Sequence, residues 1–189
     1  MRAMATHGPS HRAGAAHFHS VVRIAGIAFA GVVVSFQICG WLGIRINTSP
    51  SLPLGLYIAT SDHVENLIEF CPSEPFASTA LSRGYRDRGS CPDGGAPLLK
   101  PIIARRGDVV EFSAKGISVN GKLLPNTQPL AKDTKGRSLQ PWAFGSYVVQ
   151  PDSVWVGSSY NRHSFDSRYF GPVSTGSIRT HLRPLLTLW

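Results

Sequence analysis

An uncharged run near the N-terminus constrains this chain more than any other feature. It extends over 21 residues from Ile24 to Ile44, between Arg23 and Arg45. As a helix with a rise of about 1.5 Å per residue, the run is about 31 Å long and matches the roughly 30 Å hydrocarbon core of a bilayer. A buried core helix is the alternative, but such helices rarely stay uncharged this long, and a cleaved signal peptide has a shorter apolar core of about 7–15 residues. We therefore expect a single transmembrane anchor at residues 24–44.

The distribution of charge favours one orientation of this anchor. The 189 residues carry 19 Lys and Arg against 11 Asp and Glu, a net charge of +8, and all the acidic residues lie beyond residue 60. Such a basic chain has nucleic acid or an anionic membrane as its default partner. Positive flanks of apolar segments stay in the cytoplasm. We therefore expect residues 1–23 to form a basic cytoplasmic arm, the residues after Ile44 to face outward, and membrane lipid, not nucleic acid, to be the partner of this region.

Two of the three cysteines lie in the part of the chain that is expected to be exported. Cys39 falls inside the apolar run, whereas Cys71 and Cys91 follow it, each before a proline. A disulfide between them would close a 20-residue loop and contribute roughly 3 kcal/mol in the loop-entropy model. A two-cysteine metal site is the alternative, but no nearby Cys or His pair completes four ligands. We favour the disulfide.

Beyond the anchor, the pattern is mainly β. Short runs rich in Val, Ile, Tyr and Leu alternate with Gly, Pro and Asn, which is typical of strands and turns. Asn120-Gly121 predicts a tight hairpin turn. Residues 71–97 and 126–145 are expected to be loops. The expected strands are Leu54–Ala59, Pro97–Ala104, Asp108–Phe112, Gly116–Val119, Ser146–Val149 and Ser153–Val156.

Ser51 lies in the first of three segments that could carry chemistry. Pro50 and Pro53 bracket it and favour an extended, poorly mobile backbone. Ser51 follows Ile44 by seven residues, so it can lie at most about 25 Å from the bilayer boundary. A proline-stiffened linker is the alternative interpretation of this segment.

Lys100 stands inside an apolar run, Leu-Leu-Lys-Pro-Ile-Ile, at residues 98–103. Burial in a strand would disfavour the ammonium form and lower its pKa from about 10.4 toward neutrality. A neutral amine is what a serine nucleophile needs as general base where no histidine serves. The alternative is an edge-strand lysine whose amine reaches solvent.

The third segment, residues 161–172, is dense in hydrogen-bonding groups and ends in an aromatic residue followed by Gly-Pro. It indicates a polar network around one buried carboxylate, that of Asp166. A purely structural ion pair between Asp166 and Arg168 is the alternative.

Together the three segments resemble the serine-lysine signal peptidases (peptidase S26), and most closely their conjugative-transfer branch, the TraF type. Residues 51–57, Ser-Leu-Pro-Leu-Gly-Leu-Tyr, resemble the nucleophile box of that branch, and Leu-Lys at 99–100 with Arg-Gly-Asp at 106–108 resembles its lysine box. Residues 161–171 resemble its C-terminal box, Asn-Arg followed by Ser-x-Asp-Ser-Arg-x-aromatic-Gly. The likeness runs from about residue 47 to 189, with the anchor in the family position, and the two outward cysteines share it.

The resemblance implies a serine endopeptidase in which Ser51 attacks the scissile carbonyl and a neutral Lys100 is the general base. Ser49 would assist the backbone N–H of Ser51 in holding the oxyanion. Ser164 would orient the lysine amine. No metal and no organic cofactor is implied.

Asp166 is assigned a catalytic role by the same resemblance, and Asp166 with Arg168 would brace the C-terminal box against the lysine strand. The chain departs from many leader peptidases at Pro101, where they carry Arg. Proline lacks a backbone donor and suits an edge position. We expect an apolar groove beside Ser51 that is lined partly by Leu52, Leu54 and the lysine strand, and that prefers small residues before the cut.

The implied location is the bacterial inner membrane, with a compact β-rich catalytic domain at residues 45–189 in the periplasm. The preferred function is maturation of an exported propilin or similar precursor, by hydrolysis or with cyclisation, with other conjugation-pore components as further partners. A general leader peptidase for signal-peptide-bearing proteins is the first alternative. A non-catalytic anchored component of a conjugation or secretion assembly is the second.

Overall fold

The chain has two compact units, Met1–Gly43 and Ile44–Trp189, in the computed structural model. The structure describes residues 12–188 and, within them, the side chains of residues 23–34, 37 and 40–188. The first unit contains one helix, α1 (Arg12–Trp41), and the second contains the strands.

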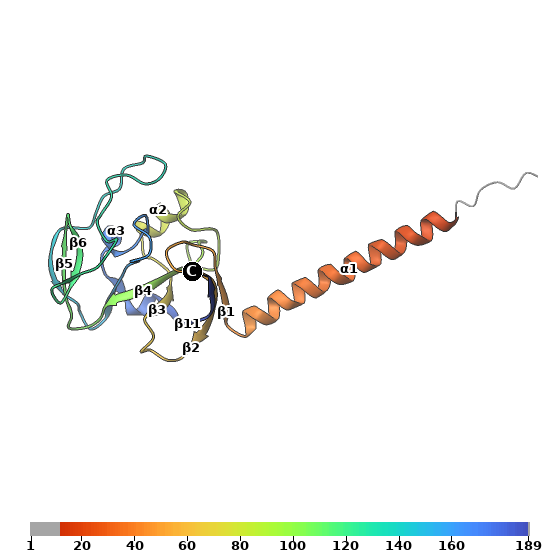
Figure 1. Cartoon of the computed structure of the whole chain (residues 1–189), viewed down its shortest axis with the longest axis horizontal. Coiled ribbons are helices and arrows are strands. Elements are labelled where there is room, and N and C mark those ends of the chain that lie inside the picture. The colour runs from red at the N-terminus through yellow and green to blue at the C-terminus, as the bar shows by residue number, and fades with distance from the viewer. Residues whose placement is uncertain (1–11, 189) are drawn as a thin grey trace, which may run out of the picture. The chain divides into compact units, whose positions relative to one another are not determined.

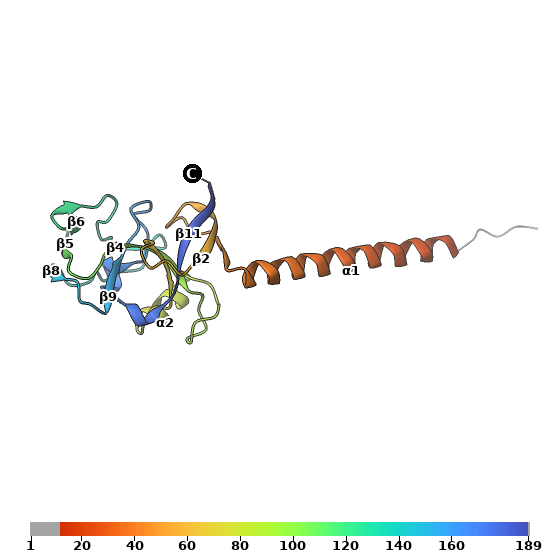
Figure 2. The ribbon, with the colours of Figure 1, turned by 90° about the horizontal axis from the view of Figure 1, so that it is seen from below.

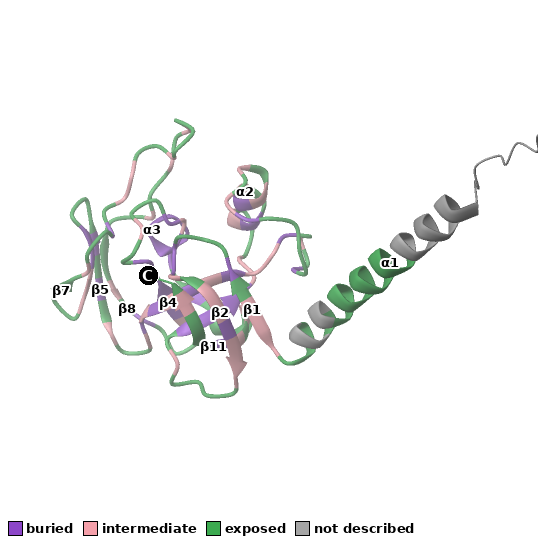
Figure 3. Cartoon of the chain, turned by 45° about the vertical axis from the view of Figure 1, so that its right-hand side comes forward, coloured by how far each residue is buried: buried purple, intermediate pink, exposed green. Residues whose placement is uncertain are grey.

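Helix α1 begins earlier and ends earlier than the expected span of residues 24–44. It ends at Trp41 because Gly43 adopts φ 75° and donates its N–H to the carbonyl of Gly40, which closes a turn before the first strand. The described side chains from Arg23 to Val34 are all exposed, and they are green in Figure 3. No helix among the described residues meets the length and hydropathy that a membrane span requires.

The second unit is built on an antiparallel sheet of seven strands (Figures 1 and 2). The long last strand lies inside it and pairs with β2 on one side and β3 on the other. In spatial order the strands are β1 (Ile44–Asn47), β2 (Leu54–Thr60), β11 (Ile178–Leu188), β3 (Leu67–Phe70), β4 (Leu98–Ala104), β9 (Ser153–Val156) and β10 (Val173–Ser174). Three strands separate β1 from β4 in this order, yet hydrogen bonds join the segment after β1 both to β4 and to the segment after β9.

A smaller antiparallel sheet has four strands in the order β7 (Lys122–Leu123), β6 (Gly116–Val119), β5 (Val109–Ser113) and β8 (Gly145–Val148). The turn between β6 and β7 has positive φ at both central residues, 50° at Asn120 and 80° at Gly121. This is the turn type that matches the twist of a hairpin. The hairpin predicted at Asn120-Gly121 is therefore confirmed.

All six expected strands are present within one or two residues, as β2, β4, β5, β6, β8 and β9. Strands β3 and β11 were not expected, because buried Glu69 interrupts the apolar run of β3 and the cations and Pro184 of β11 hide its alternation. The expectation of a loop over residues 71–97 was wrong in one part. Helix α2 (Phe76–Ser82) lies there and buries Ala77 and Ala80, which are too small to give a visible apolar stripe. The remaining short elements are α3 (Ser167–Phe170) and η1 (Thr175–Ser177).

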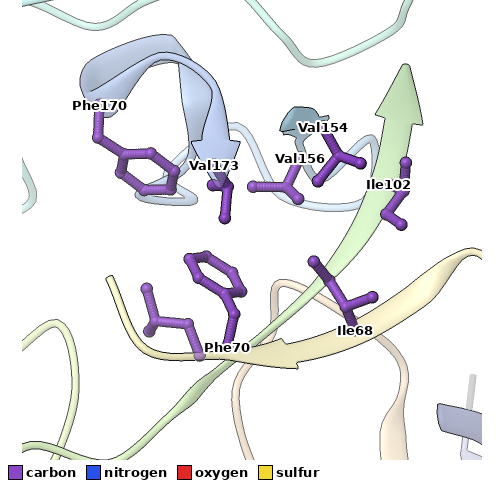
Figure 4. Packing of buried hydrophobic residues seen from close by; sticks show 8 residues of the cluster. Ile68, Phe70, Ile102, Val154, Val156, Phe170 and Val173 are labelled. Atoms are coloured by element: carbon purple, nitrogen blue, oxygen red, sulfur yellow. The ribbon is translucent and has the colours of Figure 1, made fainter. Parts of the chain in front are cut away.

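The largest core cluster joins β3, β4 and β9 to α3 and β10 (Figure 4). Ile68 and Phe70 of β3 face Val154 and Val156 of β9, with Phe170 closing one end. Two further clusters adjoin it: Trp155 and Ala104 pack against the four-stranded sheet, and Leu52 packs with Tyr57, Leu67 and Leu182. Burial therefore continues beneath the segment that carries Ser51.

Cys71 and Cys91 form a disulfide, with their Cα atoms 5.7 Å apart. Both sulfur atoms are thereby unavailable as metal ligands, which removes the two-cysteine metal site. The disulfide closes the segment that contains α2 and leads into β4.

Candidate active site

Ser51 lies in a packed loop between β1 and β2, not in a free linker. Buried Asn47, the last residue of β1, holds this loop: its Nδ2 donates to the carbonyls of Ser49, Leu52 and Pro53, and its Oδ1 accepts the N–H of Ser49. The Tyr57 hydroxyl donates to the Pro53 carbonyl at 2.7 Å. Loop and strand are thus joined by hydrogen bonds at both ends of the loop.

Gly55 of β2 is required by the approach of a neighbouring strand. Its φ is 148°, and a Cβ placed on it would lie 2.1 Å from the carbonyl oxygen of Leu186 in β11. Any side chain would push β11 away from β2 and disturb the loop that precedes it. Gly55 and Tyr57 therefore hold the loop that carries Ser51 in place.

Lys100 places its amine beside Ser51. Its Nζ lies 2.7 Å from Ser51 Oγ and 2.8 Å from Ser164 Oγ, and the two hydroxyl oxygens are 3.2 Å apart. Lys100 shares the buried face of β4 with Leu98 and Ile102 and is 4% exposed. The amine does not reach solvent, so the edge-strand alternative is wrong.

Burial disfavours the charged form of this amine. Desolvation lowers the pKa of Lys100 from 10.5 to about 8; the charge of Asp166 opposes the shift and that of Arg168 adds to it. An appreciable fraction of the amine is then neutral near neutral pH. A neutral amine within hydrogen-bond distance of a hydroxyl can accept its proton.

Ser49 lies next to the backbone N–H of Ser51. Ser49 Oγ accepts this N–H at 3.4 Å. The N–H and the hydroxyl therefore border the same space. A carbonyl oxygen that becomes negative during attack by Ser51 could receive both as donors.

Asp166 and Arg168 form a fully buried ion pair. Arg168 Nε donates to Asp166 Oδ1 at 2.8 Å and a terminal nitrogen of Arg168 to Oδ2 at 2.8 Å. The guanidinium also donates to the carbonyls of Asn126, Gln128, Asn161, Arg162 and Ser164.

We expected the Asp166–Arg168 pair to brace the C-terminal box against the lysine strand, and the contacts of Arg168 show that it is not held against that strand. Besides Asp166, the guanidinium of Arg168 reaches backbone carbonyls in two segments, around residues 126–128 and 161–164, and none of the hydrogen bonds found for Arg168 in residues 12–188 reaches β4. The carboxylate of Asp166 acts on Lys100 through its charge.

Two buried residues of the site were missed from the sequence, Asn47 and Ser158. Ser158 donates its hydroxyl to the carbonyl of Ser51 at 2.6 Å, and its backbone N–H donates to Asp166 Oδ2 at 3.1 Å. A single small polar residue carries no local pattern. Asn47 acts within its own loop, and an asparagine shortly before Pro50 and Pro53 was a usable local signal. Ser158 acts on Ser51 across 107 residues, and no local signal marks it.

A cavity of about 440 Å³ opens beside Ser51 and Lys100. The expected lining was wrong at Leu52 and Leu54: Leu52 is buried under the loop, and Leu54 does not line the cavity. The apolar part of its wall consists of Ile46, Pro50, Ala96, Pro97, Leu98, Leu99, Leu130, Leu139 and Phe165.

One side of β4 is unpaired along this cavity. Strand β3 pairs with residues 98–101 of β4, whereas β9 pairs with Ile102 and Ala104. The bond from the Ile102 N–H to the Asn66 carbonyl sets the alternation, so the N–H and C=O of Leu99 point away from β3. Pro101 was expected at an edge position. It lies at the boundary between the part of β4 that is open on this side and the part that pairs with β9, so the expectation holds only in part.

These features are those of a serine hydrolase that acts on extended peptides: a hydroxyl beside a buried amine, nearby oxyanion donors, and an open strand edge. The chain belongs to the signal peptidase family, peptidase S26, whose family model matches residues 15–185.

The chain is also similar to plasmid and conjugal transfer proteins named TraF. It is 36% identical to the plasmid transfer protein TraF of Escherichia coli over 168 residues, covering 86% of this chain and 94% of that protein. It is 34% identical to the conjugal transfer protein TraF of Agrobacterium fabrum, covering 87% and 92% of the two chains. The solved signal peptidase I of Enterococcus faecalis matches at 17% identity and a TM-score of 0.35, over 66% of this chain and 99% of that one.

Proposed function

We propose that this chain is a membrane-anchored serine endopeptidase that cleaves an exported precursor, a conjugative propilin, with Ser51 and Lys100 as its catalytic dyad. The observation that carries the proposal is the 2.7 Å contact between Lys100 Nζ and Ser51 Oγ at a buried amine. Membership of the peptidase S26 family supports the peptidase activity.

In this mechanism, Lys100 takes the hydroxyl proton as Ser51 Oγ attacks the scissile carbonyl carbon. The tetrahedral oxyanion receives the backbone N–H of Ser51 and the hydroxyl of Ser49, which turns from its present acceptor role. As the C–N bond breaks, Lys100 gives the proton to the leaving amine. The acyl group on Ser51 is then released by water, or by an amine that yields a cyclised product. Ser164 holds the lysine amine throughout, 2.8 Å from its hydroxyl.

The substrate binds as an added strand on β4. The free N–H and C=O of Leu99 face the cavity side of β4, and strand addition obtains affinity from such backbone groups and specificity from side-chain pockets. The confined, largely apolar wall near Ser51 favours small residues before the cut.

The uncharged part of α1, from Ile24 to Trp41, forms the anchor, the N-terminal arm stays in the cytoplasm, and the unit that begins at Ile44 faces the periplasm of the bacterial inner membrane. The uncharged run and its arginine flanks support the span and its orientation. The exposure of large apolar side chains on α1, among them Ile24, Ile27 and Phe29, is consistent with contact with lipid. Ser51 can then reach peptide bonds only near the membrane surface.

The relatives' names support the choice of a propilin over secreted proteins in general, because they describe plasmid transfer and conjugal transfer. Other components of the conjugation pore are further partners in this proposal. An intact serine, lysine and buried network argues against a non-catalytic component.

The test uses the full chain in bilayer vesicles with two precursors: the propilin encoded in the same gene cluster, and a secreted protein with an Ala-x-Ala signal sequence. We expect the chain to cleave the propilin and Ser51→Ala to leave it intact. Preferential cleavage of the secreted protein would replace the conjugative function by that of a general leader peptidase. Cleavage of neither precursor, or cleavage by Ser51→Ala, would contradict the proposed activity.

A further inference from the structure

Ser158 is a fully buried serine that follows β9 and faces the backbone of Ser51. Its hydroxyl donates to the Ser51 carbonyl at 2.6 Å and accepts the N–H groups of Tyr160 and Asn161, both at 3.2 Å. One hydroxyl therefore joins the loop that carries Ser51 to the start of the C-terminal segment. Ser51 and Ser158 are 107 residues apart in the chain, so this bond is a long-range contact.

The bond completes the polar contacts of Ser51. Its N–H meets Ser49 Oγ, its hydroxyl meets Lys100 and Ser164, and its carbonyl meets Ser158. Pro50 restricts the backbone before Ser51, and Asn47 holds the loop from the other side. The hydrogen bond from Ser158 is the one that acts on the orientation of the Ser51 carbonyl, and hence on the backbone from which the Ser51 side chain extends toward Lys100.

Asp166 is connected to Ser51 through the same residue. Its Oδ2 accepts the backbone N–H of Ser158 at 3.1 Å, and no hydrogen bond joins Asp166 to Lys100 among the described residues. Arg168 in turn fixes both carboxylate oxygens. A continuous buried path thus runs from the ion pair through Ser158 to the backbone of Ser51.

We infer that Ser158 is a positioning residue that transmits the rigidity of the Asp166–Arg168 pair to Ser51 and sets its hydroxyl against Lys100. This inference rests on the proposed function, because it assigns Ser51 as the nucleophile. Ser158 does not line the cavity beside Ser51, and it contacts the Ser51 carbonyl rather than the hydroxyl or the Lys100 amine. Its effect is on the rate of the chemical step, since a displacement of about 1 Å in a reacting group can cost about 10²-fold in rate.

The experiment compares Ser158→Ala with Thr127→Val in the full chain, with the propilin as substrate. Thr127 is the matched control: it is also fully buried, and its hydroxyl likewise donates to a backbone carbonyl, that of Leu124 at 2.7 Å, and accepts a backbone N–H, that of Ile117 at 3.0 Å. Each variant loses one buried hydroxyl, so both are expected to lower the melting temperature. Rates are expressed per folded molecule.

For Ser158→Ala we expect kcat to fall about 10- to 100-fold while KM stays within about threefold, because binding of the ground state is untouched. The midpoint of the pH dependence should remain about 8, because the burial of Lys100 does not change. For Thr127→Val we expect kcat within about threefold of the original chain. Equal kcat losses in the two variants, or a Ser158→Ala midpoint that moves while the plateau rate stays, would overturn the inference.

Ser158→Cys keeps the inference testable if Ser158→Ala does not fold. A thiol is similar in size but a weak donor, so the same fall in kcat is expected, and an unchanged kcat would overturn the inference. The proposed function is judged separately, by cleavage with the original chain and none with Ser51→Ala. With those two results as expected, a Ser158 variant with full kcat contradicts the positioning role alone.

Discussion

At the scale of the residue, Lys100 combines two properties that oppose each other in most lysines. It is buried among apolar side chains, and its amine still has two hydroxyl partners, Ser51 and Ser164. Desolvation lowers the pKa of the amine to about 8, so the group that is costly for folding is the group that is useful as a base.

The pH dependence of cleavage follows from this pKa. Below about 8 the amine is mostly protonated and cannot accept the Ser51 proton, so kcat/KM should rise about tenfold per pH unit and level off above that value. The measurement is kcat/KM for the propilin across this range. A flat profile between about pH 6 and 9 would exclude a lysine base with a depressed pKa.

The free energy of unfolding of the chain should also depend on pH because of this lowered pKa. A lysine keeps its proton in the unfolded state up to about 10.5, whereas the folded state releases it near 8, so between these values the unfolded state binds more protons and stability rises with pH. Relative to Lys100→Met, the free energy of unfolding of the original chain should increase by about 2 kcal/mol between about pH 7 and 9.5. Urea unfolding of both proteins at the two pH values measures this. Parallel pH dependences would show that Lys100 is not desolvated in the folded state.

At the scale of the element, Gly55 links the loop of Ser51 to the last strand. Gly55→Ala should destabilise the fold by about 3 kcal/mol or more, because the added Cβ would meet the backbone of β11 at Leu186. Gly136→Ala is the matched control: its φ is also positive, at 76°, but the added Cβ would enter open space, so it should cost only about 1 kcal/mol. Denaturant unfolding of both variants gives the comparison. Equal losses would mean that β11 does not hold β2 as closely as described.

The elements also show what could be predicted from the sequence. The strands found in advance, such as β4 and β9, are short runs dominated by Leu, Ile and Val, although Lys100 interrupts β4, and Asn-Gly at residues 120–121 is a specific turn signal. Strand β11 was missed because its pairing with β2 and β3 tolerates cations and a proline. Its position depends on tertiary contacts that no local pattern records.

The same distinction holds for the candidate site. Ser51 and Lys100 became candidates because proline bracketing and a lysine in an apolar run are locally unusual, and the resemblance of the three segments to the serine-lysine signal peptidases then assigned their roles. The lining of the cavity was partly mistaken, since Leu52 turns inward under its loop to pack with Tyr57. Ser158 was missed because its partner, Ser51, is 107 residues away.

At the scale of the whole molecule, the proposed function assigns separate tasks to the two units, anchoring to the first and cleavage to the second. Residues 44–189 have their own cores and disulfide, so deletion of residues 1–43 should leave them folded with an unchanged unfolding transition. Turnover of a membrane-embedded precursor should fall about 10²-fold, because the anchor supplies effective concentration at the membrane. Cleavage of a soluble peptide that spans the same site should not change. Equal turnover of the embedded precursor with and without residues 1–43 would contradict the role of the anchor.

The dyad of Ser51 and Lys100 is most directly tested by kcat/KM for the propilin in four proteins: the original chain, Ser51→Ala, Lys100→Ala and the double variant. Because the two groups act as a unit, each single variant should abolish measurable cleavage and the double variant should be no worse than either. Lys100→Arg should fail as well, because a guanidinium stays protonated. Substantial cleavage by Ser51→Ala or by Lys100→Ala would contradict the dyad.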